Sequence, residues 1–328
     1  DMSATTTPTT FLDLRTALLN RMRVTLGSGT PSTTNQNYGS TLINEALHDF
    51  HIQQNWWWAE RHAILFTHGD YTAGNVSIAS TARTTLEGQG GLWNTTVSGM
   101  GFNNLRAGGK LTFSGGDDEV YLVTSVASDT SATLDYRYAG GQTTATAYAL
   151  AHSDYVYYED EYALASDFFR MADLRWFSRE IELPLIPKDE FYRRYPKNAS
   201  RGKPTVATII ERGPSSSTAP RPRVLLHPSP DDVYPIPYRY LTSSLAVSSA
   251  GVGATDLSAD ADEPIIPLRY RHVLVPYAAK KWFLYLKDDQ RAEAAESEYV
   301  DLVRRIANDS EPTRDRPTLR PKRMRYIT

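Results

Sequence analysis

The chain has 328 residues, a hydrophobic content of 41%, a formal net charge of −3 and no cysteine. This composition allows a sizeable buried core and excludes wholesale disorder. Without cysteine there can be no disulfide, thiolate metal site or cysteine nucleophile. The slightly acidic balance argues against a globally basic nucleic-acid binder. No run approaches the ~20 apolar residues that a membrane-spanning helix needs.

Two amphipathic helices are expected near the N-terminus. The first begins at Thr10, because TFLD at 10–13 reads as a capping box in which Asp13 reaches back to the cap. The second runs from about Tyr38 to Trp58 and places its apolar residues on one side. Joined by a Gly- and Ser-rich link, the two predict a helical hairpin within residues 1–62.

The hydrophobic period changes to two between residues 63 and 158. Short stretches such as GNVSIAS, GKLTFSG and EVYLVTSV alternate with Gly, Asn, Asp and Ser. This pattern predicts a small all-β domain, a barrel or a sandwich, inserted between the helical parts 1–62 and 159–310. The predicted fold class is therefore α+β, an antiparallel helical bundle with an inserted β domain.

Residues 223–241, RVLLHPSPDDVYPIPYRYL, are expected to form a β-hairpin with PSPDD as the turn. Its prolines bar further strand addition at a sheet edge. Strand alternation places four side chains on one face: Tyr234, Ile236, Tyr238 and Tyr240. That face suits packing against a neighbouring subunit, or it covers the core of its own domain, and the sequence leaves both open.

Helices are again expected from about Tyr270 to Asn308, with KDDQ at 287–290 as the place where they bend or separate. Residues 311–328 contain three prolines and predict an extended arm. The arm could bind nucleic acid, dock into a partner or act as a solubilising end, and the prolines favour docking. Its basic residues and final aromatic are Arg314, Arg316, Arg320, Lys322, Arg323, Arg325 and Tyr326.

No catalytic or cofactor-binding motif is found in the sequence. Glu45, His48 and His51 have a helical metal-ligand spacing, but a solvent-exposed face explains them better. The acidic loop DLSADADEP could hold calcium through the carboxylates of Asp256, Asp260, Asp262 and Glu263. A loop whose acids complement a nearby helix dipole is the interpretation we favour. We therefore expect no enzyme activity, no cofactor and no metal.

Three consecutive tryptophans, residues 56–58, end the second predicted helix. They could form a platform on which a sugar stacks. The alternative that we favour places Trp57 in the core, with Trp56 and Trp58 flanking it at the junction with the β domain.

Several of these stretches resemble the head-to-tail adaptor proteins of tailed bacteriophages, a family that includes the tail tubular proteins of short-tailed phages. The resemblance is carried by RVLLHPSPDDVYPIPYRYL, by LSADADEPIIPLRYRHVLVPYAAKKWFLYLKDD and by AESEYVDLVRR. The N-terminal helical pair is similar in placement, and the module from about Tyr71 to Leu150 resembles small β domains inserted in such virion proteins. The resemblance spans most of the chain without an invariant chemical motif.

The resemblance implies a structural virion protein that assembles in the host cytoplasm as a ring, usually of twelve copies. Such a connector binds below the portal vertex, extends the DNA channel used in genome ejection and offers a platform for tail assembly. The implied partners are the portal protein and tail nozzle, tube or fibre proteins, with double-stranded DNA passing through the channel without specific binding and no membrane. The basic arm, Arg314 to Tyr326, would reach the portal.

In the same picture the residues expected at subunit interfaces are Tyr234, Ile236, Tyr238, Tyr240, Trp56 and Trp58. Two other functions are retained as alternatives. The first is a carbohydrate- or receptor-binding tail protein that uses the β domain and the three tryptophans. The second, a polysaccharide-active enzyme with a carboxylate pair, is disfavoured because no pair has a setting that predicts perturbed pKa values.

Overall fold

A computed structural model of the chain describes residues 8–26, 32–96, 101–114, 117, 119–140, 148–175, 182–196, 200–212 and 221–310. It is a mixed α+β structure in which helices accompany a curled, seven-stranded antiparallel half-barrel and smaller sheets. Contacts divide the chain into two units. The first unit combines Asp1–Glu60 with Leu241–Thr328, and the second is Arg61–Tyr240.

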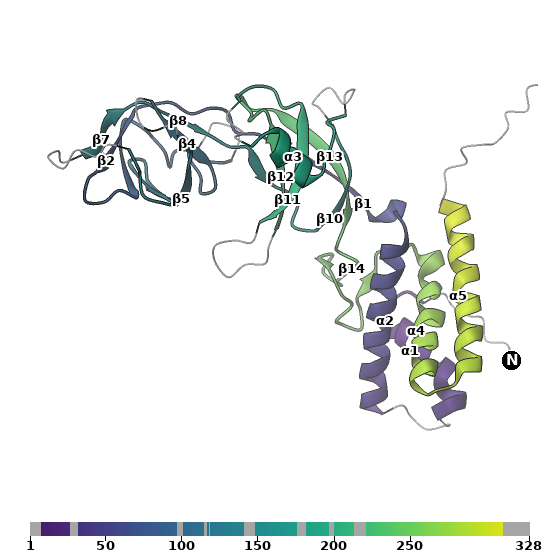
Figure 1. The fold of residues 1–328 in the computed structure, drawn as a ribbon. Coiled ribbons are helices and arrows are strands. Elements are labelled where there is room, and N and C mark those ends of the chain that lie inside the picture. Colours follow the sequence, from purple (N-terminus) through teal and green to yellow (C-terminus); the bar gives the residue numbers. More distant parts are fainter. Residues whose placement is uncertain are drawn as a thin grey trace, which may run out of the picture. The chain divides into compact units, whose positions relative to one another are not determined.

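Four helices lie side by side in the first unit (Figure 1). They are α1 (Phe11–Leu26), α2 (Thr33–Gln53), α4 (Leu274–Tyr285) and α5 (Asp289–Ser310). Helix α4 packs against each of the other three. Residues 286–288 separate α4 from α5, so the break expected at the KDDQ sequence is confirmed.

The capping box expected at the start of α1 is confirmed. The Thr10 backbone N–H donates to Asp13 Oδ2 at 3.0 Å, and the Asp13 N–H donates to Thr10 Oγ1 at 3.3 Å. The Thr9 hydroxyl donates to the same Oδ2 at 2.5 Å and is the first cause of a lowered Asp13 pKa. These bonds satisfy donors that the helix start would otherwise leave unpaired.

Helix α2 begins at Thr33 rather than near Tyr38 and ends at Gln53 rather than at Trp58. Its N-cap is Ser32, whose side chain accepts the Asn35 N–H at 3.3 Å. A polar cap of this kind was missed because the apolar periodicity begins only later in the helix.

The core of the first unit is formed by the apolar stripes of its helices. They bury Leu14, Leu18, Met22, Ile43, Leu47, Phe50, Leu274, Ala278 and Trp282. The segment that follows the second unit in the chain, residues 241–273, adds short secondary-structure elements to the first unit. These are β14 (Ala246–Val247), β15 (Gly253–Ala254), β16 (Glu263–Pro264) and the 3-10 helix η2 (Leu268–Val273).

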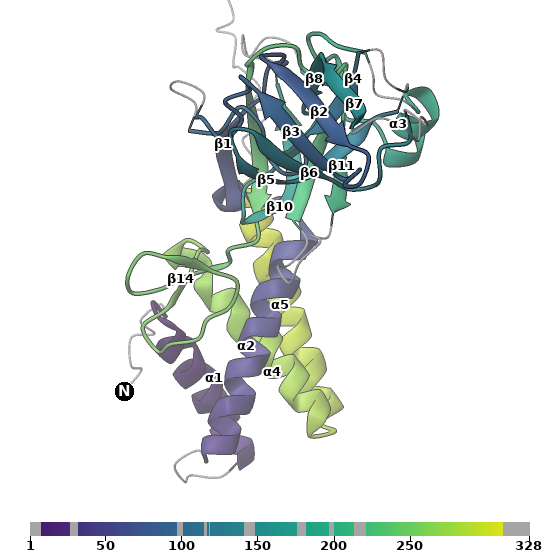
Figure 2. The same cartoon turned by 90° about the vertical axis from the view of Figure 1, so that its left-hand side faces the viewer.

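The half-barrel of the second unit has the strand order β7-β2-β3-β6-β5-β4-β8 (Figure 2). Its strands are β2 (Asn75–Ala79), β3 (Thr85–Gln89), β4 (Lys110–Phe113), β5 (Tyr121–Ser128), β6 (Ser131–Leu134), β7 (Tyr148–Ser153) and β8 (Tyr155–Tyr158). Neighbouring strands in this order run antiparallel. The alternating pattern therefore predicted the β character of this region correctly, and the sheet curls around one apolar cluster.

Two further three-stranded sheets complete the second unit, in the orders β1-β13-β10 and β11-β12-β9. The strands are β1 (Glu60–Phe66), β9 (Glu161–Ala163), β10 (Phe168–Leu174), β11 (Val206–Arg212), β12 (Arg221–His227) and β13 (Pro235–Thr242). The short helix α3 (Lys188–Arg194) follows Pro187 and buries Phe191. Residues 159–240, which we expected to continue the helical part, lie in this unit instead.

The hairpin expected at residues 223–241 is not formed. Strand β12 pairs with β11 and β9, whereas β13 lies between β1 and β10. Pro228 and Pro230 in the connection cannot donate ladder bonds. The connection bonds to other segments, from the Ser229 N–H to the Ser200 carbonyl at 2.9 Å and from the Thr67 N–H to the Tyr234 carbonyl at 3.0 Å. The prediction that PSPDD separates two strands was correct. The turn did not, however, determine which strands β12 and β13 pair with.

Buried ion pairs hold the half-barrel to the segment that leaves it. Arg106 Nε donates to Glu159 Oε1 at 2.8 Å, and the Tyr157 hydroxyl donates to the same oxygen. Next to it, Lys110 Nζ contacts Asp160 Oδ2 at 2.6 Å. Glu159 and Asp160 are both buried, so each carboxylate depends on its cation for compensation.

Asp13→Ala should lower the free energy of unfolding by about 1 kcal/mol at neutral pH. The lowered pKa means that this stabilisation is present above the unfolded-state value of about 4 and is lost as the pH falls through the folded-state value. Urea denaturation of both proteins at about pH 7 and about pH 3 measures it. Glu293→Ala, on an exposed helix face, is the control, and a difference that persists unchanged at low pH would contradict the capping role.

Glu159→Ala should destabilise the second unit by about 3 kcal/mol, because Arg106 is left without its carboxylate. The matched control is Asp301→Ala, which removes an exposed pair with Arg304 at 4.0 Å and should cost less than about 0.5 kcal/mol. Denaturation followed by circular dichroism compares the two. Equal effects would show that the Arg106 pair has no special role.

Candidate functional site

Strand β13 has one face turned to its own core, as its alternation predicted. Ile236, Tyr238 and Tyr240 are buried in a single apolar cluster. The Ala165 N–H donates to the Tyr238 hydroxyl at 3.0 Å, and the Tyr240 hydroxyl donates to Asp167 Oδ1 at 2.7 Å. Their assignment to a subunit interface is therefore corrected, since both the rings and the hydroxyls are used inside the chain.

Tyr234 differs from the other three residues on that face. It is half-buried, and its hydroxyl donates to Asp231 Oδ1 at 2.7 Å. This bond is the first cause that raises the Tyr234 pKa to about 12. Because it retains accessible surface, Tyr234 stays a predicted interface residue.

The burial of the three tryptophans is the reverse of the prediction, which placed Trp57 in the core and Trp56 and Trp58 beside it. Trp56 is only 1% exposed and stacks between Phe50 and Trp58 at centroid distances of 4.5 and 4.7 Å. Trp57 is 54% exposed. The cause is the end of α2 at Gln53, because Trp56 is extended and Trp57 begins the 3-10 helix η1 (Trp57–Ala59). Residues 56–58 therefore do not follow the helical periodicity on which the prediction was based. Because Trp56 and Trp58 are buried within the chain, their assignment to a subunit interface is wrong.

The carboxylates of the acidic loop at 256–263 contact different partners and do not converge on one point. Asp256 contacts His48 at 2.7 Å, Asp260 contacts Arg15 at 2.7 Å and Glu263 contacts Arg271 at 2.9 Å. Asp262 Oδ2 accepts the N–H groups of Ala259 and Ser258, which lower its pKa. Within the described residues no group of three or more histidine and acidic side chains could hold a metal ion.

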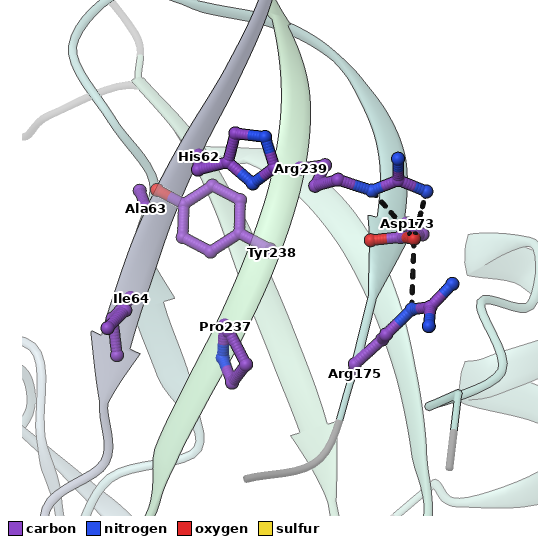
Figure 3. A pocket seen from close by; sticks show the side chains of 8 residues that line it. All are labelled: His62, Ala63, Ile64, Asp173, Arg175, Pro237, Tyr238 and Arg239. Carbon is purple, nitrogen blue, oxygen red and sulfur yellow. Dashed lines mark hydrogen bonds and ion pairs between the residues drawn. The ribbon is translucent and has the colours of Figure 1, made fainter. Parts of the chain in front are cut away.

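A surface pocket of about 470 Å³ lies on the sheet β1-β13-β10 (Figure 3). Its lining residues come from all three strands and the residue after β10: His62, Ala63, Ile64, Asp173, Arg175, Pro237, Tyr238 and Arg239. Alternation produces this face, because Pro237 and Arg239 occupy the positions between the buried Ile236, Tyr238 and Tyr240. Pro237 and Arg239 therefore line the pocket from the face of β13 opposite to its core contacts, while Tyr238 of the core face also lines it.

Two guanidinium groups converge on one carboxylate in this pocket. Asp173 Oδ2 accepts Arg239 Nε at 2.9 Å and Arg175 Nε at 3.0 Å, and Arg239 is the first cause that lowers the Asp173 pKa. The Asp173 side chain is 8% exposed, while those of Arg175 and Arg239 are 44% and 41% exposed. The exposed parts of the two guanidinium groups thus lie beside the apolar groups of the pocket.

Sequence reasoning missed this pocket. Arg239 could have been found, since it alternates with the tyrosines and must face away from them. His62, Asp173 and Arg175 gave no such signal, because only the pairing of β1 and β10 with β13 brings them together. Residues Arg314 to Tyr326, expected to bind the portal, lie outside the described residues.

Comparison with known proteins does not extend this picture: no protein-family model matches the chain, and no curated protein matches it. In the part of the chain that the structure describes, no helix combines the length and the apolar character needed to cross a membrane.

Trp56→Ala should destabilise the first unit by about 3 kcal/mol or more, because it removes a fully buried ring from an aromatic stack. Trp57→Ala, one residue away, should change stability by less than about 0.5 kcal/mol. Chemical denaturation of the two variants provides the comparison. A larger loss for Trp57→Ala would contradict the burial described above.

Proposed function

We propose that the protein is a head-to-tail adaptor of a tailed bacteriophage, a structural protein that forms a ring below the portal vertex. The resemblance in sequence provides the starting point. The observation that carries the proposal is the organisation of the first unit, in which four helices lie side by side and the last, α5, is followed directly by the basic residues 311–328. A bundle with a basic, proline-containing sequence at its end suits a subunit that docks on a larger assembly.

The β-rich unit supports the same proposal. It is continuous in sequence from Arg61 to Tyr240, and both of its ends connect to the helical unit. An insertion of this kind adds a second surface without interrupting the core of the bundle. In the proposed ring the helical unit contacts neighbouring copies and the portal, while the β-rich unit faces tail or fibre proteins.

The charge distribution is compatible with a channel for DNA. Nonspecific DNA binding depends on neutralising phosphates with cations. The formal net charge of the whole chain is −3, although residues 314–325 contain six cations. In this proposal those cations meet the portal protein, and the remainder of the ring lets DNA pass without holding it.

A carbohydrate- or receptor-binding tail protein is the second candidate, and the exposure of Trp57 favours it. An exposed indole ring can stack on a sugar face. However, Trp56 and Trp58 are buried, so a platform of three rings is not available. Glycan binding that is saturable and abolished by Trp57→Ala would support this candidate over the adaptor.

Deletion of residues 312–328 should leave folding unchanged and reduce docking to the portal protein of the same phage at least tenfold. The expected reason is the loss of the basic side chains, whose contacts are partly electrostatic and weaken with salt. Co-sedimentation with portal rings measures docking, and circular dichroism checks the fold.

A matched variant with the six basic residues Arg314, Arg316, Arg320, Lys322, Arg323 and Arg325 changed to Gln keeps the length and the prolines of the arm. It should behave like the deletion. Docking by the truncated protein at the wild-type level would overturn the arm assignment.

A further inference from the structure

A second pocket, of about 310 Å³, lies on the helical unit and is called the bundle pocket here. Its lining comes from the last residue of α2 and from α4 and α5, which lie side by side (Figure 1). The apolar part of the lining consists of Tyr277, Tyr299, Val300 and Val303. The two tyrosine rings lie 4.8 Å apart between centroids, and Val300 is 36% exposed. An apolar side chain placed in the pocket would remove this surface from water.

The hydroxyl groups of the bundle pocket already have hydrogen-bond partners. Gln53 Nε2 donates to the Tyr299 hydroxyl at 2.6 Å, and the Tyr277 hydroxyl donates to Asp49. Because these polar atoms are engaged within the unit, the two tyrosines offer mainly the faces and edges of their rings to a ligand. This arrangement favours an apolar occupant over one that needs hydrogen bonds.

The charged residues around the bundle pocket are also balanced. Lys280 Nζ contacts Glu296 Oε1 at 2.7 Å, and Arg304 contacts Asp301 at 4.0 Å. Each cation therefore has an acidic neighbour, so charge does not select the occupant of this pocket. The selection depends on the apolar surface and on which apolar side chain can reach it.

The chain itself supplies such a side chain. Residues 311–328 follow α5 directly and lie outside the described residues. Apart from prolines, Leu319 is the first apolar residue of this arm, and it stands between Pro317 and Pro321. Prolines restrict the unbound chain, which lowers the entropy that is lost when the segment becomes ordered on a surface.

The bundle pocket lies within reach of Leu319 of the same chain. Val300 and Arg304 precede the end of α5 by ten and six residues, roughly 15 and 9 Å along the helix axis. Leu319 follows that end by nine residues, which span at most roughly 30 Å when extended. The arm can therefore turn back to the pocket. A tether of this length gives an effective concentration on the order of millimolar, an advantage that a separate molecule lacks.

We propose that Leu319 of the arm occupies the bundle pocket of its own chain. The contact holds the arm against α5 and keeps it from an outside partner until that partner displaces it. This regulatory role rests on the proposed function, in which the partner is the portal protein, whereas the contact itself does not. A second copy of the chain is the alternative occupant, and the test distinguishes the two.

Disulfide trapping in the full-length chain tests the contact, because the chain has no native cysteine. With a mild oxidant, Val300→Cys/Thr318→Cys should form a disulfide within one chain at least tenfold faster than Arg305→Cys/Thr318→Cys. Arg305 is the matched control because it is exposed, closer to the start of the arm and roughly 140° around α5 from Val300. Peptide mapping by mass spectrometry measures both rates, and circular dichroism checks the fold.

Substitution of the anchoring side chain adds a second readout. In the Val300→Cys/Thr318→Cys background, Leu319→Ser should lower the trapping rate at least tenfold, because the apolar group that enters the pocket is lost. Leu319→Met keeps an apolar side chain of similar volume and should retain the rate within about twofold.

Equal rates for the two cysteine pairs, or a rate that Leu319→Ser leaves unchanged, would overturn the inference. Disulfides between chains in place of those within one chain would also overturn it and would assign the pocket to a second copy. None of these results depends on the portal protein. The effect of deleting the arm on portal docking, described above, tests the proposed function separately, so either idea can fail alone.

Discussion

The sheet that carries the candidate site depends on the position of strand β13 at its centre. Because it pairs with β1 on one side and β10 on the other, its two faces meet different surroundings. Ile236, Tyr238 and Tyr240 fill the core on one face, while Pro237 and Arg239 line the pocket on the other. The same alternation that fills this core thus also places Pro237 and Arg239 in the pocket on the opposite face.

Local signals in the sequence predicted much of the fold. The capping box of Thr10 and Asp13 and the break between α4 and α5 follow from interactions between residues close in the chain. The period of two predicted the β character of residues 63–158 for the same reason. Each of these features is decided within a few residues, where propensity and periodicity are reliable guides.

Features that depend on distant partners could not be predicted in this way. The strands β12 and β13 were assigned to one hairpin, yet they join different sheets because β9, β10 and β1 compete for their edges. The tryptophan pattern was reversed because α2 ends earlier than its periodicity suggested. The pocket escaped notice since Asp173 and Arg239 are brought together only by sheet pairing.

The central claim is that this chain is a structural subunit of the junction between phage head and tail. Electron cryomicroscopy of purified particles, with the position and copy number of this chain determined, tests it most directly. The account predicts a closed ring of this chain directly beneath the portal, with the helical unit lining the junction. A chain absent from the particle, or present only at the tips of fibres, would contradict it.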